Sequence, residues 1–361
     1  MSQPALPAEL ILYTIECLIP PDPPIIFPRD HEVTRTLLNL TLVCKLVSRR
    51  ARQLLIKYCL QIDSGDRLDQ LLQSGVFCST RNNLPSSINL FLAPFPVENL
   101  NIPPTVQQVE TLSTLLCHSL TRLIIDMPLR YLYPEEDIHY LRPILRAAFS
   151  RMTALEEFTS VRDELYLATD PVPELDEAAL EAGEIPELQP MVWSFWPNLS
   201  RLALYNVAVD HGQFLGGLQK CQRLTHLVLV RPDGLAEEVD PEKMGMDKDF
   251  LPALQRLVIV NTGLGFLHTS PFDEASWEAS FVGRLDALRK SRGGDGDGDG
   301  AHSESSVASY LSLRMPFGRD DEDIEICQEW LAKQATSGLL WGLSDKRQDL
   351  LHEHIMRSPA F

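Results

Sequence analysis

The sequence has no apolar run long enough to cross a bilayer, which takes about 20 consecutive residues. It also lacks a secretion leader, because the start has no basic region and Glu9 and Glu16 interrupt its apolar stretch. Its seven cysteines include no pair with the two-residue spacing of zinc or redox motifs. These absences predict a cytoplasmic or nuclear protein with reduced thiols, no membrane contact and no bound metal.

Basic residues are few: 32 Lys and Arg stand against 50 Asp and Glu, so the net charge is −18. A chain of this charge repels the phosphates of nucleic acids and of anionic membranes. The excess of acidic residues therefore argues against nucleic acids and anionic membranes as main partners, and it is typical of a solvated surface. The apolar fraction of 44% is ordinary, and 361 residues can bury a large core.

Enzyme motifs are also missing, since the chain has no Gly-x-Ser-x-Gly elbow and no Gly-Lys-Ser/Thr phosphate loop. The Gly-Asp repeats in residues 291–306 lack the spacing of an EF-hand and predict a flexible loop. The sequence therefore predicts no catalytic residue, no cofactor and no enzyme activity. Only a pocket of converging polar groups would indicate an enzyme.

The chain does contain a recurring pattern, Leu-x-x-Leu-x-Leu. Its last two apolar positions are two residues apart, so in an extended chain they face the same side. A helical stretch before or between copies returns the chain, so successive strands are predicted to lie parallel. Recurrence of such a unit is typical of repeat proteins with a shared core. The copies are Leu120, Leu123 and Ile125; Leu199, Leu202 and Leu204; Leu224, Leu227 and Leu229; and Leu254, Leu257 and Ile259.

This pattern resembles the leucine-rich repeat family. The resemblance implies an α/β fold in which short parallel strands build a solenoid. The family's asparagine would fall at Val207, Pro232 and Thr262, and copies begin 25 and then 30 residues apart. We therefore expect an irregular, divergent array.

The N-terminal segment predicts two amphipathic helices. Leu-Pro-x-Glu-Leu at residues 6–10 opens the first, and Val-Cys-Lys at residues 43–45 follows Leu40 in the second. Together these motifs resemble an F-box, as in the F-box-like proteins of filamentous fungi. The resemblance implies docking on the Skp-type adaptor of a cullin–RING ubiquitin ligase. The adaptor contacts that it implies are Leu6, Pro7, Leu10, Ile11, Ile15, Leu40, Val43, Cys44 and Lys45.

Two features depart from the F-box pattern. The connection over residues 20–35 is longer than the family's, and Val47 stands where the family often carries Trp or Phe. The alternative is that the two helices only cap the array, whose terminal repeat would otherwise expose its core.

The strand positions between the inward apolar residues point to the opposite face of the sheet. One column across the copies is basic, and the neighbouring columns are mostly apolar. We hypothesise that this face binds a protein substrate with acidic or phosphorylated residues near an apolar segment. Alternatively, a C-terminal helix covers it, because parallel sheets are often buried on both faces. The predicted substrate face comprises Arg122, Arg201, Tyr205, His226 and Arg256.

The predicted organisation has four parts. They are an F-box-like module (1–60), a leucine-rich-repeat array (61–290), a flexible loop (291–306), and a last strand with capping helices (307–361). The resemblance implies the substrate-receptor subunit of an SCF-type ubiquitin ligase, with the Skp-type adaptor, the cullin complex and an unknown protein substrate as partners. The alternative is a leucine-rich-repeat scaffold without a ubiquitin-ligase role.

Overall fold

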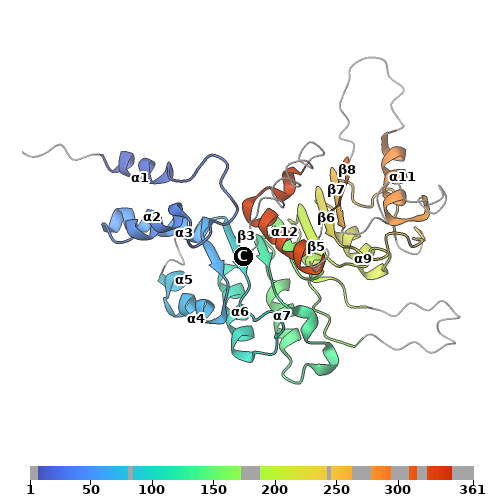
Figure 1. Cartoon of the computed structure of the whole chain (residues 1–361), viewed down its shortest axis with the longest axis horizontal. Coiled ribbons are helices and arrows are strands. Elements are labelled where there is room, and N and C mark those ends of the chain that lie inside the picture. The colour runs from blue at the N-terminus through green and yellow to red at the C-terminus, as the bar shows by residue number, and fades with distance from the viewer. Residues whose placement is uncertain are drawn as a thin grey trace, which may run out of the picture.

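The computed structural model describes residues 7–79, 84–171, 188–241, 245–261, 278–293, 309–314 and 323–343. Leu6 and most of the predicted loop over 291–306 lie outside these residues. Figure 1 shows the strands side by side through the middle of the molecule, with the three N-terminal helices at one end.

One sheet of eight parallel strands organises the fold, and its strands follow the order of the chain. The copies of the apolar pattern form β3, β5, β6 and β7. Leu202 is in register with Leu227, and Leu227 with Leu257, so equivalent repeat positions line up across the sheet. The strands are β1 (Leu60–Ile62), β2 (Ile88–Leu92), β3 (Leu120–Ile125), β4 (Glu157–Ser160), β5 (Arg201–Tyr205), β6 (His226–Val230), β7 (Arg256–Asn261) and β8 (Ser309–Arg314).

The helices between the strands cover one face of the sheet and share its main core. In α6, for example, Pro103 and Pro104 start the first turn, and Val106, Val109 and Leu116 recur at helical spacing and are buried. Burial of each such side chain contributes about 1.5–3 kcal/mol. These helices are α4 (Gly65–Gln73), α5 (Val76–Ser79), α6 (Pro103–Leu116), α7 (Leu141–Ser150), α9 (Gly212–Lys220) and α11 (Phe281–Gly293), with short 3-10 turns η1 (Leu129–Tyr131), η2 (Pro134–Glu136) and η3 (Val192–Phe195).

The second face is covered by α12 (Asp323–Ser337) and η4 (Leu340–Gly342). Trp330, Leu331 and Trp341 pack there with Val228 and Val258, which are 1% exposed. These strand residues are too apolar to be left in water, so the C-terminal helix lies across the sheet.

This arrangement corrects the predicted fold class. The sequence predicted an F-box-like module, a leucine-rich-repeat solenoid and a helix capping its end. The structure is an α/β protein whose parallel sheet carries helices on both faces, and α12 lies on the sheet's face instead of at its end.

The three N-terminal helices are α1 (Ala8–Glu16), α2 (Glu32–Leu40) and α3 (Lys45–Tyr58), and they bury a small core around Leu37 and Ala51. The connection between α1 and α2 binds them to the sheet. Its Ile25–Phe27 are buried, and the Ile25 carbonyl accepts a hydrogen bond from Asn89 of β2 at 2.9 Å. The extra length of this connection therefore has a packing role. The predicted domain boundary at residue 60 stays a prediction.

Candidate functional site

A cleft of about 340 Å³ lies at the carboxyl edge of the sheet, beyond the ends of three neighbouring strands. Arg130 follows β3, Glu164 and Tyr166 follow β4, and His211 follows β5. Ligands of parallel α/β sheets bind at this edge, because the loops after several strands meet there. The lining residues are Arg130, Glu164, Tyr166, Ala168, Asp170, Pro171, Leu188, Gln189, Met191, Val207, Ala208, His211, Gln213 and Phe214.

An ion pair between Arg130 and Glu164 forms one wall of this cleft. The Nη2 of Arg130 is 2.6 Å from Oε1 of Glu164, and its Nε donates to Oε2 at 3.3 Å. Burial is the largest single effect and lowers the pKa of Arg130, but the charge and hydrogen bond of Glu164, with the nearby Asp163 and Tyr133, together outweigh it, so the net pKa is raised. Glu164 is 8% exposed and Arg130 is 40% exposed, so the cation presents part of its guanidinium to the cleft.

Two guanidinium groups lie close to the ring of Tyr166. Arg130 is 5.1 Å from its ring centroid and Arg142 is 4.6 Å from it, distances at which a cation is attracted to the ring. Burial raises the pKa of the Tyr166 phenol, and the two arginines act against this effect. The phenol is therefore held as a neutral hydroxyl that can donate a hydrogen bond.

The segment after β4 is held in place by two arginines of α7. Arg142 is fully buried and donates to the carbonyls of Leu129, Leu132, Tyr166 and Ala168. Arg146 donates to the carbonyls of Leu167 and Pro190. These bonds join both sides of the cleft to one helix.

Asp163 is a buried acid directly behind this wall. It is 1% exposed, and its Oδ1 accepts from the backbone N–H of Leu165 at 2.8 Å and of Tyr166 at 3.3 Å. Its Oδ2 has no hydrogen-bond partner in the part of the chain that the structure describes. Burial, followed by the charge of Glu164, raises the pKa of Asp163 to about 7. Leu165 has a φ of 65°, so the turn that places Asp163 and Tyr166 is strained.

The opposite wall carries an imidazole and two amides. His211 precedes α9 without bonding that helix through its side chain, and the residue is exposed. Gln213 donates to the Gln189 carbonyl, and Gln189 donates to Thr169 and Asp170. The floor between the walls is apolar, with Val207 and Phe214 buried. Polar groups of this kind can bind the hydroxyl groups of a small molecule, and an imidazole among them can exchange a proton with that molecule.

Sequence reasoning missed these residues. The motif search compared short local patterns, whereas these groups come from segments that follow three different strands. A usable signal was present: charged and aromatic residues at 163–166 directly follow a strand, and parallel strands bring such segments together.

The predicted adaptor-binding residues differ in their exposure to solvent. Pro7, Leu10, Val43, Cys44 and Lys45 are exposed, whereas Ile15 is 4% exposed inside the module's core. Ile11 and Leu40 are half-buried against that core. Leu6 lies outside the described residues. That the exposed members contact another protein stays a prediction.

The predicted substrate face is partly covered by α12 and η4. Tyr205 is 3% exposed, and its hydroxyl accepts a hydrogen bond from Arg231 at 2.8 Å, so it cannot contact a partner in this arrangement. Arg122, Arg201, His226 and Arg256 are half-buried and lie in one row across the strands. The alternation within the repeat pattern predicts this row, and the structure places α12 beside it.

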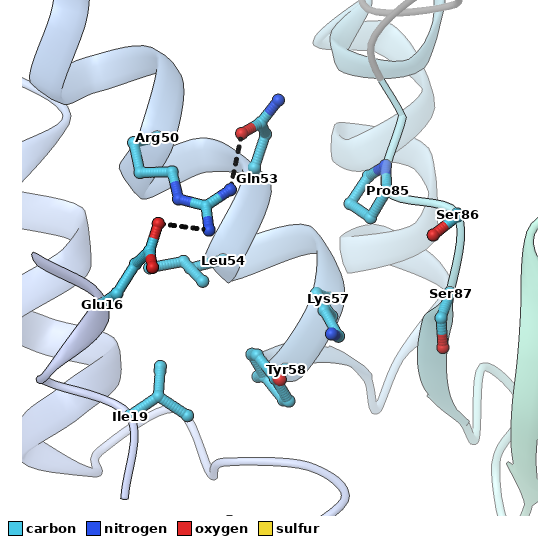
Figure 2. Close-up of a pocket in the computed structure, with 10 residues that line it drawn as sticks. All are labelled: Glu16, Ile19, Arg50, Gln53, Leu54, Lys57, Tyr58, Pro85, Ser86 and Ser87. Carbon is cyan, nitrogen blue, oxygen red and sulfur yellow. Dashed lines mark hydrogen bonds and ion pairs between the residues drawn. The ribbon is translucent and has the colours of Figure 1, made fainter. Parts of the chain in front are cut away.

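A second cleft, of about 350 Å³, separates the N-terminal helices from the segment before β2. Figure 2 shows Pro85, Ser86 and Ser87 across from α3. Arg50 is 2.7 Å from a Glu16 carboxylate oxygen and bonds Gln53. Since its charged groups largely pair with one another, we interpret this cleft as a seam between the helices and the sheet.

In the described ranges, no group of three or more His, Cys, Asp or Glu side chains is placed to hold a metal ion. Within those same ranges, no helix combines the length and apolar character needed to span a bilayer.

Comparisons with known proteins return little. No family model matches the chain, and no curated protein matches it. Among solved structures, it is similar to a sugar phosphate isomerase/epimerase from Parabacteroides distasonis, with 10% identity, 77% of each chain covered and a TM-score of 0.23. A TM-score this low carries no argument about fold or activity.

These findings correct the family-based predictions. No family model matches the chain, so neither the F-box nor the leucine-rich-repeat resemblance is supported by one. The assignment to those families, the ubiquitin-ligase receptor role, the alternative scaffold role, and the Skp-type, cullin and protein-substrate partners are therefore withdrawn. The prediction that the chain is not an enzyme is withdrawn as well, because the structure contains the pocket of converging polar groups that the motif search could not find.

Proposed function

We propose that this protein binds a small hydroxyl-bearing molecule in the cleft at the carboxyl edge of the sheet and exchanges a proton with it through His211. One observation carries the proposal: a carboxylate–guanidinium pair, a neutral phenol and an imidazole meet above an apolar floor at the ends of three adjacent strands. Imidazole is the side chain used most often for proton transfer in proteins.

The chemistry of the cleft favours hydroxyl groups on the ligand. Its carboxylates, Glu164 and Asp170, and its imidazole can accept hydrogen bonds, and Tyr166 can donate one. A polyol, sugar or hydroxy acid offers both donors and acceptors within the volume that the cleft provides.

The test is a thermal-shift screen of sugars, polyols and hydroxy acids, followed by calorimetry on the compounds that stabilise the protein. His211→Ala and Tyr166→Phe are expected to weaken binding about tenfold, because each removes a hydrogen bond to the ligand. His118→Ala is the matched control, since His118 is exposed and lies outside the cleft. The proposal fails if no compound binds the wild type, or if the cleft variants bind as tightly as the control.

A second candidate function rests on the N-terminal helices. Six large apolar side chains there are between 43% and 85% exposed: Leu10, Tyr13, Leu38, Leu42, Val43 and Leu46. A group of this kind on a folded protein is typical of a binding surface for another protein. Lys45 and Arg49 lie beside it and are exposed, which favours a partner surface with carboxylates at its rim.

For this surface, we expect the Leu42→Asp, Val43→Asp double variant to lose a partner that co-purifies with the wild type. Ile138→Asp is the matched control, because Ile138 is 74% exposed and belongs to the segment before α7. Circular dichroism establishes that both variants are folded. A docking role would be contradicted if the wild type, the double variant and the Ile138→Asp control all recovered the same proteins.

We further infer a cytoplasmic or nuclear location. The described cysteines are free thiols, which supports a reducing compartment. Localisation of a tagged chain by microscopy tests this inference.

A further inference from the structure

A row of charged side chains crosses the sheet on the face that carries α12. Arg122, Glu157, Arg201, His226 and Arg256 are in register on the consecutive strands β3 to β7. Neighbouring members are therefore separated by about 4.8 Å, the spacing of strands in a sheet. Three arginines and a histidine share this row with a single carboxylate.

Glu157 compensates only one end of the row. Its Oε1 is 3.2 Å from Nε of Arg122 and 2.8 Å from Nη1 of Arg201. Its Oε2 accepts a hydrogen bond from Nε1 of Trp341 at 3.1 Å. This buried carboxylate, 9% exposed, is thus fully used by groups at its own end of the row.

The other end of the row has an excess of positive charge. No ion pair joins a carboxylate to His226 or Arg256 within the described part of the chain, and Nε of Arg256 is buried without a hydrogen-bond partner. The Oγ1 of Thr225 lies 2.9 Å from Nδ1 of His226. Burial and the charges of Arg201 and Arg256 lower the pKa of His226, as expected where positive charge is uncompensated.

Trp341 lies beside the middle of the row, because it bonds Glu157 and its ring is close to Arg201 and His226. Its ring centroid is 6.0 Å from the Arg201 guanidinium and 6.4 Å from the His226 ring. Trp341 and α12 cover the adjoining apolar strand residues, so these residues are closed to a peptide, whereas a small anion needs only the charged side chains of the row. The side chains of Arg201, His226 and Arg256 all remain partly exposed.

We propose that Arg201, His226 and Arg256 form a binding site for a phosphate group, supplied as inorganic phosphate or as a small phosphate monoester. Guanidinium groups present a planar fork of donors that matches phosphate oxygens, and a bound dianion also favours the charged imidazole. The whole chain has a net charge of −18, so general electrostatic attraction does not draw anions to it. Binding depends on the local excess at this row.

The experiment measures phosphate binding by calorimetry and thermal shift at constant ionic strength, with chloride as the reference anion. The wild type is expected to bind phosphate. Arg256→Gln is expected to bind it at least about tenfold more weakly, because one charge-assisted hydrogen bond is lost. Arg223→Gln is the matched control, since Arg223 is exposed and lies just before β6 outside the row. Glycerol phosphate, run in parallel, distinguishes a monoester from the free ion.

A second readout locates the site. Phosphate is expected to raise the pKa of His226 in NMR titrations of the wild type, and Arg256→Gln is expected to need about tenfold more phosphate for the same shift. The proposal is overturned if phosphate stabilises the wild type no more than chloride does, or if Arg256→Gln binds phosphate like the wild type. Binding with no shift of the His226 signals would place the anion elsewhere and would also overturn it.

Discussion

Replacing Arg142 with methionine is expected to lower the free energy of unfolding by about 3–5 kcal/mol. The side chain is fully buried and donates to the carbonyls of Leu129, Leu132, Tyr166 and Ala168. Methionine fills a similar volume but leaves these carbonyls without their donor. Urea denaturation followed by circular dichroism measures the change.

The same substitution is expected to impair the cleft at the sheet's carboxyl edge. Arg142 holds the segment that carries Tyr166, and its guanidinium also stacks on the Tyr166 ring. Arg223→Met is the control, because this exposed arginine donates a single side-chain bond, to Asn198. A loss below about 1 kcal/mol for Arg142→Met would show that the carbonyls find water instead.

Replacing Asp163 with asparagine is expected to remove a pH dependence of stability between about pH 4 and pH 7. Burial raises the pKa of Asp163 to about 7 in the folded protein, above the ordinary value of about 3.9 in an unfolded chain. The folded state therefore binds more protons than the unfolded state in this window, and wild-type stability falls as the pH rises through it. Above pH 7 Asp163 is ionised in both states, so the folded protein carries the full free-energy cost of a buried carboxylate.

Asparagine resembles the protonated acid and keeps an oxygen for the N–H groups of Leu165 and Tyr166. The melting temperature of Asp163→Asn should accordingly match that of the wild type near pH 4 and exceed it at pH 8. Asp170→Asn provides the comparison, since Asp170 lines the same cleft on the surface side. A constant difference between wild type and Asp163→Asn at all pH values would mean that Asp163 does not titrate in this range.

The sequence by itself predicted the strands that carry the repeat pattern and much of their alignment. The apolar pattern at Leu199, Leu224 and Leu254 predicts β5, β6 and β7, and it places their equivalent residues in register. This succeeds because side-chain alternation in a strand is local and because repeated units pair in the same way. The basic row from Arg122 to Arg256 follows from the same alternation.

Tertiary structure alone decided what covers the strands and where the cleft forms. A pattern of apolar residues shows that the second sheet face needs cover, but not which segment supplies it; the structure assigns it to α12, with Ile25 and Ile26. The family resemblances failed because short motifs such as Leu-Pro-x-Glu-Leu are shared by amphipathic helices of many kinds. The cleft depends on groups that follow three strands, and only the parallel sheet brings Arg130, Glu164 and His211 together.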